Sequence, residues 1–186
     1  MNTRDAVSLI SEVIPRDGGT WADLGAGDGT FTRALAELVG AKGRIYAVDH
    51  DAGAVAALER WAKKAAANVV PVRADFTGPF DLPGLGAEML DGLLFANALH
   101  FVPDPGHVLA SLTARLRPGG RVVIVEYDGR PASRWVPYPL PVERLQALAS
   151  VAGISVPVIM ASRPSAYGGN LYVAASDRHS AGEGYR

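Results

Sequence analysis

Cysteine is absent from the 186 residues of this chain, which excludes disulfides, thiolate zinc sites and a cysteine nucleophile. An excess of positive charge is also absent, because the formal net charge is −1, so no general attraction to phosphate backbones or anionic lipid is expected. No apolar run approaches the ~20 residues needed to cross a bilayer, and the N-terminal residues lack the pattern of a signal peptide. We therefore expect a cytoplasmic protein that binds neither nucleic acid nor membrane.

The composition is that of a globular protein, with 48% apolar and 20% charged residues. The length fits one domain with a substantial core. We predict a single domain over residues 1–176 and a polar C-terminal tail over 177–186.

Apolar runs of strand length alternate along the chain with segments of helical periodicity. The predicted helices are 3–14, 31–38, the segment after Asp51, the segment from Asp104 to Leu116, and 142–152. The predicted strands are 20–24, 44–48, 69–73, 90–96, 121–126, 156–162 and 171–175. Alternation of this kind favours an α/β fold, Rossmann-like and doubly wound, with a mostly parallel sheet and helices on both faces. No helix separates the last two strands, so a C-terminal antiparallel hairpin is expected.

The strongest motif is a glycine-rich turn over residues 23–30, Asp-Leu-Gly-Ala-Gly-Asp-Gly-Thr, which leaves the first strand and opens a helix. Glycines in such a turn let a ligand approach the backbone closely, and the helix N-terminus offers free N–H groups. A tight turn without a ligand would have the same pattern. A dinucleotide fingerprint needs its third glycine one position later than Gly29. Asp23, two residues before the first glycine, would repel a pyrophosphate but suits a ligand with an ammonium group.

Residues 21–32 resemble the first motif of class I S-adenosylmethionine-dependent methyltransferases, and the likeness extends over nearly the whole chain, including the terminal hairpin of that family's seven-stranded sheet. The resemblance implies S-adenosylmethionine as cofactor and S-adenosylhomocysteine as product. It also implies that Asp23 and the turn residues Gly25, Ala26, Gly27 and Gly29 hold the methionine portion and line the ribose.

Asp49 ends the second strand about 20 residues after the turn, where a carboxylate can accept both hydroxyls of a ribose. Its alternative role is a helix cap, for which Asp51 is better placed. The resemblance adds the neighbouring His50 to the cofactor site. It also implies that Asp75 accepts from the adenine amine while Phe76 packs on the ring; the alternative is an ordinary turn aspartate beside a core phenylalanine.

The segment 95–101, Phe-Ala-Asn-Ala-Leu-His-Phe, is similar to the fourth motif of small-molecule methyltransferases of the quinone-biosynthesis type. The resemblance implies that Asn97 borders the methionine part of the cofactor. His100 is the candidate general base, because an unperturbed imidazole titrates at about pH 6.5; a satisfied histidine at a strand end is the alternative. The acidic metal ligands of catechol-type members are not recognisable, so a metal-independent reaction is expected.

On the substrate side, Glu126 ends the fifth strand at the edge where ligands of such folds bind. Trp135 and Tyr138, in a proline-rich loop, are candidates for the wall of an apolar or aromatic acceptor, or for a core plug or homodimer contact. His107 is interpreted as a surface residue. The predicted function is methyl transfer to an O, N or C atom of a small molecule. A non-catalytic S-adenosylmethionine-binding regulatory protein is the alternative, ahead of an NAD-dependent oxidoreductase and an RNA methyltransferase.

Overall fold

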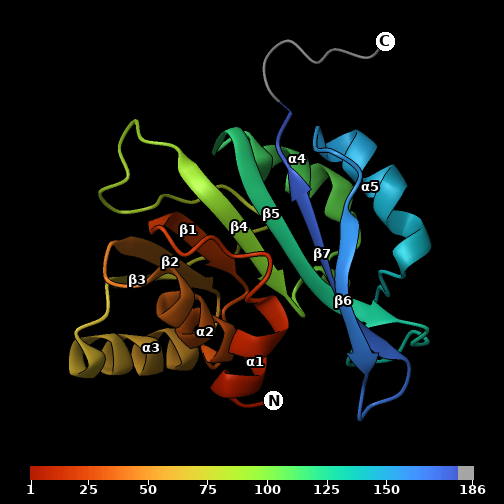
Figure 1. The fold of residues 1–186 in the computed structure, drawn as a ribbon, viewed down its shortest axis with the longest axis horizontal. Coiled ribbons are helices and arrows are strands. Elements are labelled where there is room, and N and C mark those ends of the chain that lie inside the picture. Colours follow the sequence, from red (N-terminus) through yellow and green to blue (C-terminus); the bar gives the residue numbers. More distant parts are fainter. Residues whose placement is uncertain (180–186) are drawn as a thin grey trace.

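The computed structural model describes residues 1–179 and shows one sheet of seven strands. The strands are β1 (Gly19–Leu24), β2 (Gly43–Asp49), β3 (Val69–Arg73), β4 (Leu90–Ala96), β5 (Leu116–Asp128), β6 (Val158–Pro164) and β7 (Asn170–Asp177). Their order across the sheet is β3-β2-β1-β4-β5-β7-β6 (Figure 1). The five strands from β1 to β5 are mutually parallel, whereas β7 runs antiparallel to both β5 and β6. The predicted fold class and its terminal hairpin are confirmed.

Helices cover both faces of this sheet. They are α1 (Thr3–Ile10), α2 (Thr30–Val39), α3 (Ala52–Ala65), α4 (Pro105–Thr113) and α5 (Leu145–Ala152), with short 3-10 turns η1 (Leu99–Phe101) and η2 (Val142–Arg144). The first three pack on one face and the last two on the other (Figure 1). Within residues 1–179, no helix is both long and apolar enough to span a bilayer.

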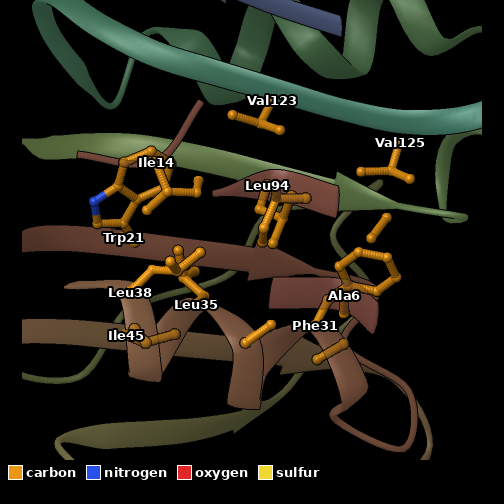
Figure 2. Close-up of a cluster of buried hydrophobic side chains, with 14 of the residues drawn as sticks. Ala6, Ile14, Trp21, Phe31, Leu35, Leu38, Ile45, Leu94, Val123 and Val125 are labelled. Atoms are coloured by element: carbon orange, nitrogen blue, oxygen red, sulfur yellow. The ribbon is translucent and has the colours of Figure 1, made fainter. Parts of the chain in front are cut away.

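Two apolar clusters result from the alternation of side chains along the strands, since successive residues point to opposite faces. On the α2 face, Leu35 and Leu38 pack against Trp21 of β1 and Leu94 of β4 (Figure 2). On the α4 face, the neighbouring strand residues Ala22 and Leu93 belong to the second cluster instead. Burial of both faces fixes the register of the sheet and therefore the positions of the turns at its edges.

Two helix starts follow the sequence signals closely. The Asp51 carboxylate accepts from the Ala54 amide at 2.7 Å and caps α3. The Asp104 carboxylate caps α4, whose first residue is Pro105. Asp51 is therefore the N-cap that the sequence predicts, and Asp104 followed by proline is a common helix start of the same kind.

Several predicted boundaries are wrong, among them that of β6, which was expected at 156–162 and is Val158–Pro164. The first helix ends at Ile10 rather than Ile14 and is capped by Asn2, which exchanges side-chain bonds with Asp5 in a capping box. Leu116 begins β5 instead of ending α4, because the Pro-Gly-Gly segment that follows it is absorbed in the strand as a register shift. The predicted tail starts too early, since Asp177 belongs to β7 and Arg178 bridges to Ile154. Its remainder, 180–186, lies outside the described residues.

Candidate functional site

A cavity of about 1220 Å³ opens at the edge of the sheet where the parallel strands end. One half of its wall comes from the turns that follow β1, β2, β3 and β4. The other half comes from the start of α4, the end of β5, the β6–β7 hairpin and the beginning of α1. Ligands of doubly wound sheets bind at this edge.

The glycine turn forms part of the first half, and its backbone requires glycine. Gly25, Gly27 and Gly29 have φ angles of 80°, 52° and 81°. A Cβ on Gly25 would lie 2.7 Å from the Cβ of Ala98, whereas one on Gly27 would meet no atom within 4 Å. Gly25, Ala26 and Gly27 line the cavity; Gly29 caps α2 behind it, where a Cβ would overlap Leu58. The space beside the α-carbon of Gly27 is therefore open.

Asp49 lies at the end of β2 and lines the same cavity. One of its carboxylate oxygens accepts from the Gly27 amide at 2.7 Å, and the other accepts from the Asp51 amide at 2.8 Å. His50, also on the cavity wall, has its Nδ1 3.6 Å from the Asp49 carboxylate. The glycine turn and the acidic strand end thus form one hydrogen-bonded unit.

Asp75 and Phe76 line the cavity beyond β3. One Asp75 oxygen accepts from the backbone and hydroxyl of Thr77, at 2.9 and 2.7 Å. These hydrogen bonds lower the pKa of Asp75, so that it is a carboxylate at neutral pH. The Phe76 ring meets Phe95 edge to face, with centroids 6.0 Å apart. An acceptor and a flat apolar surface therefore stand side by side.

Asn97 follows β4 with a φ of 55°, an unusual value for a residue other than glycine. Its backbone amide donates to Val125 at 2.8 Å. Its side-chain Oδ1 is buried, on the cavity wall, with no hydrogen-bond partner among the described residues. An unsatisfied buried oxygen is costly unless a ligand donor completes it. Asn97 is therefore suited to an N–H donor of a bound molecule.

Asp23 does not line the cavity. It is 1% exposed and accepts from the Thr32 hydroxyl at 2.6 Å, while its Oδ1 has no partner within residues 1–179. Burial raises the pKa of Asp23 to about 7, against the opposing effect of the Thr32 hydrogen bond. The contact of Asp23 with a methionine portion stays a prediction; in this structure the side chain is bonded to Thr32 of α2.

The predicted base His100 and the predicted substrate residue Glu126 are paired in the interior. The His100 Nδ1 lies 2.7 Å from Glu126 Oε2, and the His100 amide donates to Oε1 at 3.1 Å. The two side chains are 4% and 0% exposed, and neither lines the cavity. The structure therefore does not bring His100 or Glu126 to the reacting space. The sequence placed both near the ligand edge but could not tell that they satisfy each other behind its wall.

Trp135 and Tyr138 are also away from the cavity wall. They are 63% and 43% exposed, and the Arg134 guanidinium stacks on the Trp135 ring at 4.5 Å. From the same loop, Val136 and Leu140 enter the core instead. The proline-rich loop therefore anchors through its aliphatic residues, and its aromatic rings remain at the surface.

Sequence reasoning missed most of the second half of the wall. Its members are Met1, Asp5, Phe101, Val102, Pro103, Asp104, His107, Val108, Tyr127, Leu171 and residues 163–167. Topology offers a signal for the hairpin. Because β7 is antiparallel to β5 and to β6, β6 must end at the same edge as β5, and the hairpin turn lies over the ligand edge.

Carboxylates dominate the charged groups of the cavity. Five aspartates line it: Asp5, Asp28, Asp49, Asp75 and Asp104. Among the described residues, Arg163 is the one lysine or arginine that lines the cavity. This surplus of negative charge favours a cationic ligand. No cluster of three or more His, Asp or Glu side chains able to hold a metal occurs within residues 1–179.

Comparison with known proteins finds methyltransferases among its matches. A ribosomal RNA small subunit methyltransferase H from Thermomicrobium roseum is 34% identical over 92 residues, which are 47% of this chain and 27% of that protein. The chain spans a third or less of the curated relatives that it matches.

Among solved structures, an S-adenosylmethionine-dependent methyltransferase from Aquifex aeolicus superposes with a TM-score of 0.73 at 20% identity, covering 93% of this chain and 89% of that one. A Burkholderia thailandensis 1,6-didemethyltoxoflavin-N1-methyltransferase, solved with its substrate and S-adenosylhomocysteine, gives 0.72 at 24% identity, covering 96% and 78%. The model of the methyltransferase domain family matches residues 22–120, more than half of the chain. This chain belongs to the methyltransferase domain family.

Proposed function

We propose that this protein binds S-adenosylmethionine in the first half of the cavity and transfers its methyl group to an O, N or C atom of a small apolar or aromatic molecule in the second half. The proposal depends on one observation, which is that three features suited to the cofactor meet at the same cavity. The glycine turn, the Asp49 carboxylate and the unsatisfied Asn97 oxygen come from three different strand ends and line one cavity.

The nucleoside end of the cofactor fits the β2 and β3 side. Asp49 offers acceptor lone pairs for the ribose hydroxyls beside His50, and Asp75 offers an acceptor for the adenine amine next to the Phe76 ring. Hydrogen bonds to charged groups contribute roughly 1.5–3 kcal/mol each. Asp49 is therefore the residue on which affinity depends most.

The methionine end fits the β1 and β4 side. Gly27 leaves room for a close approach, and the Asn97 Oδ1 would accept from the ammonium group. The surplus of aspartates on the wall complements the positive charges of the sulfonium and the ammonium group. Bound there, S-adenosylmethionine supplies a methyl group already activated for displacement.

The residues of this chain then hold the acceptor in line and keep water out, effects that can contribute about 7–11 kcal/mol. Phe101, Tyr127 and Tyr167 give the second half aromatic walls. The Burkholderia structure, which contains bound 1,6-didemethyltoxoflavin, supports a small-molecule acceptor. The proposal assigns no metal to the reaction, so EDTA is expected to leave turnover unchanged.

Calorimetric titration tests the cofactor assignment. S-adenosylhomocysteine is expected to bind, and NAD to leave that binding unaffected. Competition by NAD, or absence of any S-adenosylhomocysteine binding, would contradict the proposal.

Transfer itself is tested with cofactor labelled at the methyl group and fractionated small-molecule extracts. Label recovered in a small molecule supports an enzyme, whereas cofactor binding without transfer favours the regulatory alternative. Because one relative is a ribosomal RNA methyltransferase, small-subunit RNA serves as a second acceptor in the same assay, and we expect no label in it. A homodimer and a cytoplasmic location stay predictions, which light scattering and cell fractionation test.

A further inference from the structure

Asp104 and His107 form a hydrogen-bonded pair at the start of α4. The His107 Nδ1 lies 2.6 Å from the Asp104 Oδ2, and both residues line the cavity. Their side chains are 66% and 81% exposed, so the second ring nitrogen of His107, Nε2, is not enclosed by protein. A carboxylate on Nδ1 keeps a proton there and leaves Nε2 as a proton acceptor.

The pair belongs to the second half of the cavity. His107 follows β4 along the chain and lines the cavity with Phe101, Pro103 and Val108, which belong to the same segment at the start of α4. The other histidine of the wall, His50, follows β2 beside Asp49 and so belongs to the nucleoside side. A base that serves the acceptor must therefore be sought at His107.

Two aromatic rings of the same cavity wall are joined by Arg130. Its guanidinium stacks on the Tyr127 ring at 4.7 Å and on the Tyr167 ring at 5.5 Å, which ties the hairpin turn to the end of β5. Both rings line the cavity. Aromatic rings on a cavity wall are surfaces on which a planar acceptor can pack.

We propose that His107 is the general base of the methyl transfer, that Asp104 positions it, and that the acceptor is an aromatic molecule with a weakly acidic hydroxyl group. The proposal rests on the function proposed above. His107 Nε2 takes the hydroxyl proton, and the oxygen lone pair forms a bond to the methyl carbon. The carbon–sulfur bond breaks with its electron pair remaining on sulfur, which leaves S-adenosylhomocysteine, the methyl ether and an imidazolium that returns its proton to water.

The other titratable groups on this side are less suited to the role. They are Met1 with its α-amino group, Asp5 of α1, Tyr127 of β5, Arg163 of β6 and Tyr167 of the hairpin turn. Burial raises the pKa of Tyr127, which keeps its phenol protonated at neutral pH. Free carboxylates are weak bases at neutral pH, and the guanidinium does not lose its proton. Among the side chains, proton removal near neutral pH thus falls to the imidazole.

Two phenols used as acceptors distinguish a role of His107 in proton removal from a role in aligning the acceptor. 4-Nitrophenol ionises near neutral pH and needs no base, whereas 4-methylphenol remains protonated. His107→Gln is expected to slow methylation of 4-methylphenol by about 10²-fold or more and to change the rate on 4-nitrophenol less than about threefold. Asp104→Asn, which keeps a capping oxygen, is expected to lower the rate on 4-methylphenol and to shift its pH profile. His179→Gln, at an exposed histidine away from the cavity wall, is the matched control and should match wild type on both phenols.

A second readout does not depend on turnover. With S-adenosylhomocysteine bound, 4-nitrophenol at mildly acidic pH should show more phenolate absorbance in wild type than in His107→Gln, because the imidazole takes its proton. Equal losses of rate on both phenols, or equal absorbance in the two proteins, would overturn the role of His107. S-adenosylhomocysteine binding without methylation of either phenol by wild type would overturn the acceptor class while leaving the proposed cofactor site intact. Failure of S-adenosylhomocysteine to bind would remove both proposals.

Discussion

The Asp49 carboxylate joins the end of β2 to the glycine turn, because it accepts from the Gly27 amide at 2.7 Å while its other oxygen accepts from the Asp51 amide at 2.8 Å. Asp49→Asn removes the charge and turns one oxygen into an amide donor that faces an N–H group. We expect the affinity for S-adenosylmethionine, measured by calorimetry, to fall about tenfold or more. We also expect the free energy of unfolding to fall by about 1–3 kcal/mol. Asp51→Asn is the control, because asparagine caps a helix as well as aspartate does. Unchanged affinity in Asp49→Asn would remove the ribose assignment.

Two substitutions of Asn97 distinguish its effect on cofactor affinity from its effect on the stability of the protein. Asn97→Gly loses the unpartnered Oδ1 and relieves the φ of 55°. We expect weaker S-adenosylmethionine binding with an apo protein at least as stable as wild type. Asn97→Ala loses the same oxygen but keeps the backbone strain, so it should bind as weakly as the glycine variant and unfold at a lower urea concentration. Normal affinity in both variants would show that the oxygen contacts no part of the cofactor.

Asp23 predicts a specific pH dependence of stability. Burial raises its pKa from 3.8 to about 7 in the folded protein, so the native state binds this proton more tightly than the unfolded chain does. The contribution is fully present below about pH 4 and is lost as the pH rises to about 7, with an upper limit of about 4 kcal/mol. Asp23→Asn keeps an acceptor for the Thr32 hydroxyl without the charge.

We therefore expect Asp23→Asn to gain stability over wild type at pH 8 and to gain little at pH 4, measured by urea unfolding. The Thr32→Val variant, which removes the hydrogen bond and keeps the carboxyl group, is the matched control and should retain the pH dependence. An equal difference between Asp23→Asn and wild type at both pH values would contradict the assignment.

The parts of this protein that were predictable from sequence are those encoded locally. The limits of β3 and β4, the capping of α3 by Asp51 and the glycine turn each depend on a few neighbouring residues. The strand ends then meet at one edge through the parallel topology alone, which is why residues on four different strands could be assigned to one cofactor site.

The second half of the cavity wall was not predictable in the same way, because it is assembled from segments far apart in the chain. Sequence alone did not show that Arg130 would bring Tyr127 and Tyr167 together, or that His107 would face a cavity. The prediction that Trp135 and Tyr138 of the proline-rich loop line the acceptor site lacked support for a related reason. Trp135 and Val136 are adjacent and both apolar, and only the packed structure decides that valine enters the core.

The buried pair of His100 and Glu126 predicts a structural rather than a catalytic phenotype. His100→Ala leaves the Glu126 carboxylate unpaired at 0% exposure, so we expect a loss of about 3–5 kcal/mol in unfolding free energy. The double variant His100→Ala with Glu126→Gln removes the stranded charge and keeps an acceptor for the backbone amide of residue 100. It should therefore recover part of the loss. At a temperature where each variant is folded, S-adenosylhomocysteine affinity and turnover should remain near wild type. A stable His100→Ala protein with a large fall in kcat would instead indicate that His100 takes part in the reaction. In that case the cavity wall would have to open toward His100.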